Sequence, residues 1–277
     1  MTLDLLESAA SGFILQVERF YAGLMRAAKP GLAGAPCPAS ETWDQRSDSE
    51  PNLGGKLLYA GELNAETRAL IVAANIAGAA SLAVSADGET RKQFMRDGVV
   101  DFLVTSLDEA LRILKNEIRK RETVAVCVAV ASVAVVADFA REMQERGVIP
   151  DLVRPGAADS LEGQTLLCWR VASSPAIWLP KLDAIALDCL EASLGAPGLD
   201  SETWDSARRW LRLAPRYLGR LAQGIRVLRC NESSAAIFLE RMREEVERGE
   251  IGVRIELRRS REGQSEQYSF APLPRHD

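Results

Sequence analysis

The residues best placed for chemistry lie at the ends of two short apolar runs between positions 56 and 87. The first run ends at Gly61 and is followed by the turn "ELNAE" (residues 62–66), whereas the second ends near Ser85 and Asp87. In a strand–helix–strand unit, the first turn can hold a diphosphate, and an acid after the second strand can hold a ribose. Gly61, Asn64, Ser85 and Asp87 are therefore candidate residues for binding a dinucleotide cofactor.

The turn lacks two properties that a diphosphate site normally has. After Gly61 there is no glycine until Gly78, so the backbone has no small residue where a diphosphate would approach it. Glu62 and Glu66 also place negative charge at the turn, which repels a diphosphate at short range. Two interpretations stay open: a purely structural strand–helix–strand unit, or a divergent nucleotide site.

The other side chains exclude several kinds of active site. The single histidine, His276, is the penultimate residue, so a Ser-His-Asp triad or a histidine-based metal site has no suitable imidazole, and we expect no metal site. No two cysteines form a CxxC pair, and several lie in apolar runs, which predicts buried, reduced thiols. The five cysteines are Cys37, Cys127, Cys168, Cys189 and Cys230.

The composition is that of an ordinary globular protein. The 277 residues are 47% apolar and 26% charged, with a net charge of −5 and a pI of about 5.3, which disfavours nucleic acid as a partner. No apolar run is long enough to cross a bilayer. Charged residues interrupt the apolar stretch 1–28, which argues against a signal peptide. We therefore expect a cytoplasmic protein with no membrane partner.

Hydrophobic patterning divides the chain into three parts. Residues 1–53 contain a helical pattern over 2–28 and a Pro-, Gly- and Ser-rich arm over 29–53. Residues 54–160 alternate helical segments with the apolar runs "KLLYAG", "SLAVSA", "DFLVTS", "TVAVCVAVA" and "PDLV". Runs without polar alternation are typical of strands buried on both faces. The fold class that we predict is α/β, with a Rossmann-like parallel sheet and flanking helices.

The third part, residues 161–277, is predicted to be mainly helical and to end in a hairpin that turns near Gly263. Strands are expected at "QTLLCWRVA" and "RVLRC". Helices are expected after Pro180, over 201–213 and 215–223 with Pro215 between them, and over 233–248. Asp183 and Asp188 are five residues apart, a poor spacing for paired carboxylates, so both are expected to be exposed.

Seven arginines without an intervening acid occupy the segment 206–229. They are Arg208, Arg209, Arg212, Arg216, Arg220, Arg226 and Arg229. The segment could bind an anion or an acidic partner. We favour a solvated face whose arginines meet water or acids from residues 240–256, and therefore assign none of them to a site.

Residues 53–155 resemble the central NAD-binding domain of urocanase (urocanate hydratase). The resemblance rests on the strand "GGKLLYAG", the helix and strand "AANIAGAASL", the capping segment "TSLDEALR", and "ERGVIPDLV". Their order and spacing agree over roughly 100 residues. The resemblance implies a cytoplasmic homodimer of histidine breakdown that uses tightly bound NAD⁺ as an electrophile to hydrate its substrate.

The departures from that family fall in the loops expected to contact a ligand. The glycine-rich loop of the family is replaced by "ELNAETRA", and the acid that ends its second strand is replaced by Ser85, with Asp87 two residues later. Residues 154–160, "RPGAADS", replace a polar stretch, and apolar "AVAS" follows "TVAVCV". All four loops are expected at the C-terminal edge of the sheet, where open α/β sheets bind ligands.

Two functions are compatible with these observations. In the first, the domain has lost NAD and hydratase activity and binds a different small molecule at the C-terminal edge of the sheet, or a protein. In the second, it is a divergent urocanate hydratase-like lyase that keeps NAD near Gly61, Asn64 and Asp87. Two features distinguish these functions: the turn at residues 62–66, and Asp87, which lies two residues after the position of the family's acid.

Overall fold

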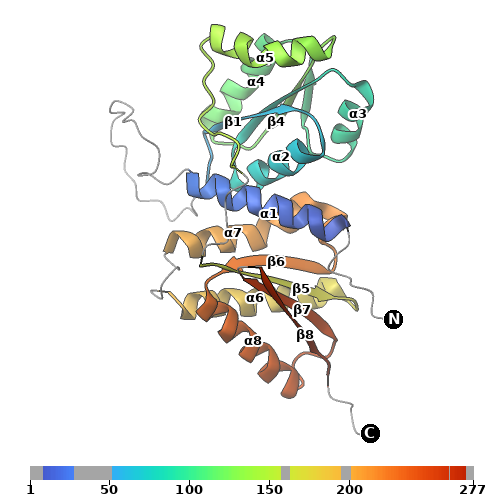
Figure 1. Ribbon diagram of the computed structural model, residues 1–277, viewed down its shortest axis with the longest axis vertical. Helices are drawn as coiled ribbons and strands as arrows, with labels where there is room; N and C mark the ends of the chain where they lie inside the picture. The colour runs from blue at the N-terminus through green and yellow to red at the C-terminus, as the bar shows by residue number, and fades with distance from the viewer. Residues whose placement is uncertain (1–8, 28–51, 157–162, 195–200, 262, 273–277) are drawn as a thin grey trace. The chain divides into compact units, whose positions relative to one another are not determined.

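The computed structural model describes residues 9–27, 52–156, 163–194, 201–261 and 263–272 (Figure 1). The chain divides into two compact units: Arg19–Ala157 form one, and Met1–Glu18 with Ala158–Asp277 form the other. The division falls within helix α1 (Ala9–Ala27), which contributes residues to both. Of the expected features, Cys37, His276 and the arm up to residue 51 lie outside the described residues. Every described helix is too short or too polar to span a bilayer.

The unit Arg19–Ala157 contains a parallel sheet, as the sequence predicts. Strands β1 (Leu57–Glu62), β2 (Ala80–Ser85), β3 (Phe102–Val104) and β4 (Ala125–Ala129) are arranged in the order β1-β2-β4-β3. All three pairings are parallel. Strand β2 is buried along its whole length, which agrees with its sequence of apolar and small residues, "ASLAVS".

The prediction of a strand at "PDLV" is wrong, because only Leu152 of this segment forms a bridge, which pairs it with Leu58. The amide of Leu152 donates to the carbonyl of Leu57 at 3.0 Å, but the amide of Leu57 donates to the Asp151 carboxylate at 2.9 Å. A side chain thus takes the place of a backbone carbonyl, and Pro150 offers no amide of its own. The segment therefore follows β1 for a single residue.

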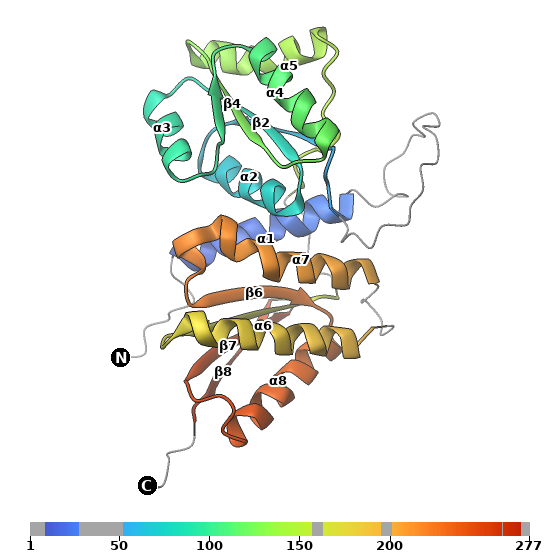
Figure 2. The ribbon, with the colours of Figure 1, turned by 180° about the vertical axis from the view of Figure 1, so that it is seen from behind.

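Four helices cover this sheet: α2 (Ala65–Ala77), α3 (Gly88–Arg96), α4 (Leu107–Lys120) and α5 (Val133–Glu145). Figures 1 and 2 both place α4 and α5 on one side of the sheet and α2 on the other. Buried side chains of α4 and α5, among them Leu114 and Phe139, form one core cluster with Leu82, Val84 and Val126 of the sheet. Phe94, the buried side chain of α3, lies outside that cluster.

The ends of α4 and α5 follow local signals in the sequence. Ser106 caps α4 by accepting from the amide of Glu109 at 3.3 Å. The Glu109 carboxylate accepts from the amide of Thr105 at 3.2 Å, one residue before the position expected of a reciprocal capping box. Helix α5 ends just before Gly147, whose φ of 69° requires the left-handed conformation that glycine adopts readily.

The other unit, Met1–Glu18 with Ala158–Asp277, is called the C-terminal unit. It contains an antiparallel sheet with the order β6-β5-β7-β8. Its strands are β5 (Thr165–Val171), β6 (Ile225–Cys230), β7 (Ile255–Arg261) and β8 (Gln264–Phe270). The hairpin β7-β8 turns at Gly263, which has a φ of 84°, as the sequence predicts. The predicted strands "QTLLCWRVA" and "RVLRC" are also present, and they pair with one another.

Helices α6 (Pro175–Ala192), α7 (Ser201–Leu218) and α8 (Glu232–Glu247) complete this unit, with a 3₁₀ turn η1 (Gly219–Ala222) after α7. The prediction that Pro215 divides two helices is wrong, because α7 continues through this proline. Proline removes one helical hydrogen bond, but Leu211, Ala214 and Leu218 stay buried on one face, and their burial offsets the loss. Helix α6 likewise begins at Pro175 and continues through Pro180.

Two arginines of the segment 206–229 form ion pairs that are mostly buried. Arg229 donates to both carboxylate oxygens of Glu18 on α1, at 2.8 and 2.7 Å, and only 4% of the Glu18 side chain is exposed. Arg226 donates from Nε to Asp183 at 3.0 Å. The expectation that their acids come from residues 240–256 is therefore wrong. Being three residues apart on β6, the two arginines point to opposite faces of the sheet.

We expect Glu18→Gln to destabilise the C-terminal unit by about 3–5 kcal/mol, because it leaves the Arg229 guanidinium buried without its counter-charge. Urea denaturation followed by circular dichroism measures the change. Glu240→Gln is the matched control: the pair Arg243–Glu240 is exposed on α8, and its loss should cost less than about 1 kcal/mol. Equal effects of the two substitutions would contradict the role given to the buried pair.

Candidate functional site

The four candidate residues lie together at the C-terminal ends of β1 and β2. Gly61 has a φ of 86° and follows a register irregularity in the pairing of β1 with β2. The turn after β1 is held against β2 by a hydrogen bond from the amide of Leu63 to the carbonyl of Val84, at 3.0 Å. The backbone therefore positions Gly61 and Asn64 beside the end of β2, where Ser85 and Asp87 follow.

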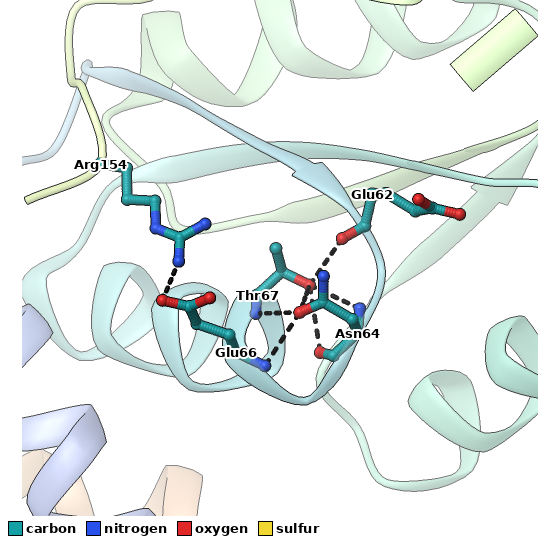
Figure 3. Close-up of polar contacts among 5 residues, drawn as sticks. All are labelled: Glu62, Asn64, Glu66, Thr67 and Arg154. Carbon is teal, nitrogen blue, oxygen red and sulfur yellow. Dashed lines mark hydrogen bonds and ion pairs between the residues drawn. The ribbon is translucent and has the colours of Figure 1, made fainter. Parts of the chain in front are cut away.

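The Asn64 side chain caps helix α2 (Figure 3). Its Oδ1 accepts hydrogen bonds from the amides of Glu66 and Thr67, at 2.9 and 3.0 Å. In return, the Thr67 hydroxyl oxygen lies 2.7 Å from the amide of Asn64, which donates to it. The same hydroxyl lies 2.8 Å from the carbonyl oxygen of Glu62. Asn64 and Thr67 thus form a reciprocal capping box that uses two of the first amides of the helix.

Glu66 and Arg154 form an ion pair across the same turn (Figure 3). Their side chains are each somewhat less than half exposed. The Arg154 guanidinium carbon also lies 5.9 Å from the centroid of the Phe20 ring, within range of a cation–π contact. The loop of residues 154–160, which replaces a polar stretch of the family, therefore begins with a residue that neutralises an acid of the turn. Its residues 157–160 lie outside the described residues.

Ser85 and Asp87 are used in the connection from β2 to α3. The buried Ser85 hydroxyl accepts from the amide of Asp87 at 3.2 Å. The exposed Asp87 carboxylate caps α3, accepting from the amides of Glu89 and Thr90 at 3.3 and 3.0 Å and from the Thr90 hydroxyl. These hydrogen bonds, that of the Thr90 hydroxyl above all, lower the pKa of Asp87. Asp87 is therefore a charged helix cap at neutral pH.

These contacts do not match the needs of a dinucleotide. A diphosphate needs unbonded amides and a backbone that it can approach, whereas the Glu66 and Thr67 amides are bonded to Asn64. A ribose would have to compete with Thr90 for the Asp87 carboxylate. Gly61, Asn64, Ser85 and Asp87 nevertheless lie at the edge where the sequence places a ligand, and their use by a cofactor stays a prediction.

A second part of this edge, between β2 and β4, was missed by the sequence analysis. Arg91 of α3 donates from Nη1 to the Ser85 carbonyl at 2.8 Å, and the amide of Val130 donates to the same oxygen at 3.1 Å. The guanidinium therefore lies where β2 and β4 end. No motif in the sequence marks Arg91, because its position depends on how α3 packs.

The two strands that meet at Arg91 continue into helices on opposite faces of the sheet. The connections β1–α2–β2 and β2–α3–β3 run in the same direction across the sheet, so right-handed crossovers place α2 and α3 on one face. Helix α5, which follows β4, packs on the other face with α4. Open α/β sheets bind ligands where adjacent strands diverge in this way. Here the start of α5 is apolar and open, with Val133 66% exposed.

Four of the cysteines are buried thiols, as the sequence predicts. Burial raises the pKa of Cys127 and Cys230 to about 12 and that of Cys168 and Cys189 to about 11. These groups stay protonated at neutral pH and do not act as nucleophiles. Among the described residues, no group of three or more His, Cys, Asp or Glu side chains could hold a metal ion.

Among the described residues of the C-terminal unit, Asp183 is the one acid whose pKa is strongly raised. The expectation that it is exposed is wrong, because only 16% of its side chain is accessible and it pairs with Arg226. Burial raises its pKa to about 6, and the attraction of Arg226 offsets this only in part. Its Oδ1 has no hydrogen-bond partner in the described part of the chain. Sequence spacing alone could not show that β6 places an arginine beside this helix.

Residues 43–160 match the family model of the urocanase Rossmann-like domain. The match includes all four strands of the parallel sheet and the turn capped by Asn64. It confirms the resemblance seen over residues 53–155 and leaves most of the C-terminal unit unmatched. The chain thus contains a urocanase-like Rossmann-like domain, in which the turn after β1 is bonded to its own side chains.

The pH dependence of stability tests the environment of Asp183. A carboxyl whose pKa is 3.8 unfolded and about 6 folded contributes stability that is complete below pH 4 and lost as the pH rises through 6. The loss is at most about 3 kcal/mol. The free energy of unfolding of the wild type should therefore fall relative to that of Asp183→Asn between pH 4 and 7. No change over this range would instead identify an ordinary ion pair, because a lowered pKa changes stability mainly below about pH 4.

Proposed function

We propose that the urocanase-like domain, residues 54–160, has lost NAD-dependent hydratase activity and acts as a binding module. The observation that carries this proposal is the capping box of Asn64 and Thr67, which occupies the amides that a diphosphate would use. The scaffold of the family is kept, and the turn that would receive the cofactor is used to stabilise the fold instead.

Charge supports the proposal. A diphosphate bound at the start of α2 would meet the carboxylates of Glu62 and Glu66, and Arg154 is already paired with Glu66. To serve the cofactor, Arg154 would have to leave Glu66 and expose that carboxylate to the diphosphate. The positive end of the α2 dipole is likewise satisfied by the Asn64 side chain and by Glu66 in its first turn.

Three titratable groups in or just after the strands that lead to this edge support the loss of catalysis. A general acid or base works best when its pKa lies near the working pH. Hydrogen bonds lower the pKa of Asp87, whereas burial raises the pKa of Tyr59 and raises that of Cys127 to about 12. None of these three groups is poised to exchange a proton near neutrality.

The place that remains for a ligand is the edge between β2 and β4. Arg91 supplies a positive charge there, and the apolar start of α5 supplies an open surface at Val133. Asp87, the N-cap of the same helix α3, carries a negative charge. A small ligand with both a polar end and an apolar body fits this chemistry better than a dinucleotide does.

Thermal denaturation of the full chain with and without millimolar NAD⁺ tests the proposal. We expect the same melting temperature in both samples, with adenosine as a control ligand that lacks the diphosphate. A ligand at a hundred times its Kd adds about 2.7 kcal/mol to stability, which is readily measured. Stabilisation by NAD⁺ but not adenosine, together with consumption of urocanate, would instead establish the divergent lyase.

A further inference from the structure

The outer face of helix α6, in the C-terminal unit, carries an unusual surface. Figure 2 shows α6 in front of the antiparallel sheet, between α7 and α8. Its inner face is buried through residues that contact this unit: Leu179, Leu182, Ala186, Cys189 and Leu190. The opposite face is open, with Ile177 60% exposed. None of these residues belongs to the part of the chain matched by the urocanase domain.

The exposed residues recur at steps of three and four and so form one continuous stripe along the helix. We define the α6 stripe as Ile177, Pro180, Lys181, Ala184, Asp188 and Glu191, all of which are exposed. Half of these residues are apolar, whereas the outer face of a solvated helix is normally charged or polar. The stripe extends for about 21 Å, given the rise of an α-helix.

The charges of the stripe are separated along the helix. Lys181 lies in its first half, whereas Asp188 and Glu191 lie in its second half. The Lys181 ammonium lies 4.7 Å from the centroid of the Trp178 ring, which holds it at the helix surface. Within the described ranges, none of the three charged residues takes part in an ion pair. The stripe therefore carries a positive and a negative half without local partners.

We infer that two copies of this chain associate through the α6 stripe, with their α6 helices antiparallel about a two-fold axis at Ala184. In this arrangement Lys181 faces Asp188 of the partner subunit, and the symmetry repeats the pair. Ala184 lies at the crossing, where a small side chain allows the helices to approach closely. A parallel arrangement would instead place each lysine beside its own copy, so the charge pattern selects the antiparallel dimer.

The size of the stripe sets the strength of this association. Stable complexes bury about 800 Å² on each partner, and a single helix face supplies only part of that area. The dimer is therefore a weak one. Its two ion pairs lie at the rim of the interface, so they select orientation and partner more than they add affinity.

Sedimentation equilibrium of the full chain, over about 1–200 µM at low salt, tests this inference through a charge swap. Lys181→Glu and Asp188→Lys each place like charges opposite one another twice, and each should raise the Kd of the dimer at least about tenfold. The double variant restores opposite charges and should return the Kd to within about threefold of the wild type. Lys92→Glu, on an exposed position of α3, is the matched control and should leave the Kd unchanged.

Two results would overturn the inference. A wild-type chain that stays monomeric at the highest concentration would show that no second copy covers the stripe. A dimer whose Kd is the same in both single variants would show that the interface lies elsewhere. Because all three substituted positions are exposed, circular dichroism should give the same fold for every variant.

Discussion

The hydrogen bonds from the amides of Glu66 and Thr67 to the Asn64 side chain determine what the N-terminal end of α2 can do. The first amides of a helix are either capped from within or available to an anion, and the same amide does not serve both fully. Here the cap is reciprocal, because Thr67 also bonds the Asn64 amide and the Glu62 carbonyl. The turn thus joins β1 to α2 through hydrogen bonds of its own residues, and the Glu66 carboxylate pairs with Arg154.

The parallel sheet fixes the sequences of its strands but not those of the loops at its C-terminal edge. A parallel sheet buried on both faces needs helices on each side, and this requirement keeps β1, β2 and β4 apolar whatever the ligand. The loops at the C-terminal edge are free of that requirement. In this chain two of them have become helix caps, at Asn64 and Asp87, and the edge between β2 and β4 is defined by Arg91.

The sequence predicts what depends on local pattern. The four parallel strands follow from apolar runs, and the hairpin follows from Gly263, where a φ of 84° suits glycine. The capping box could have been predicted too, because Asn64 and Thr67 stand at the spacing of a helix cap. The positions of Arg91, Arg154 and Asp183 could not, because each depends on a residue far along the chain or on how a helix packs.

The most direct test of the closed turn is the NMR signal of the Glu66 and Thr67 amides in the isotope-labelled full chain. If Asn64 caps α2, both amides keep their chemical shifts when millimolar NAD⁺ is added, and both shift in Asn64→Ala but much less in Asn64→Ser, which retains a capping oxygen. Saturable shifts of these two amides with NAD⁺ in the wild type would show that the cofactor reaches the turn and that the cap does not exclude it.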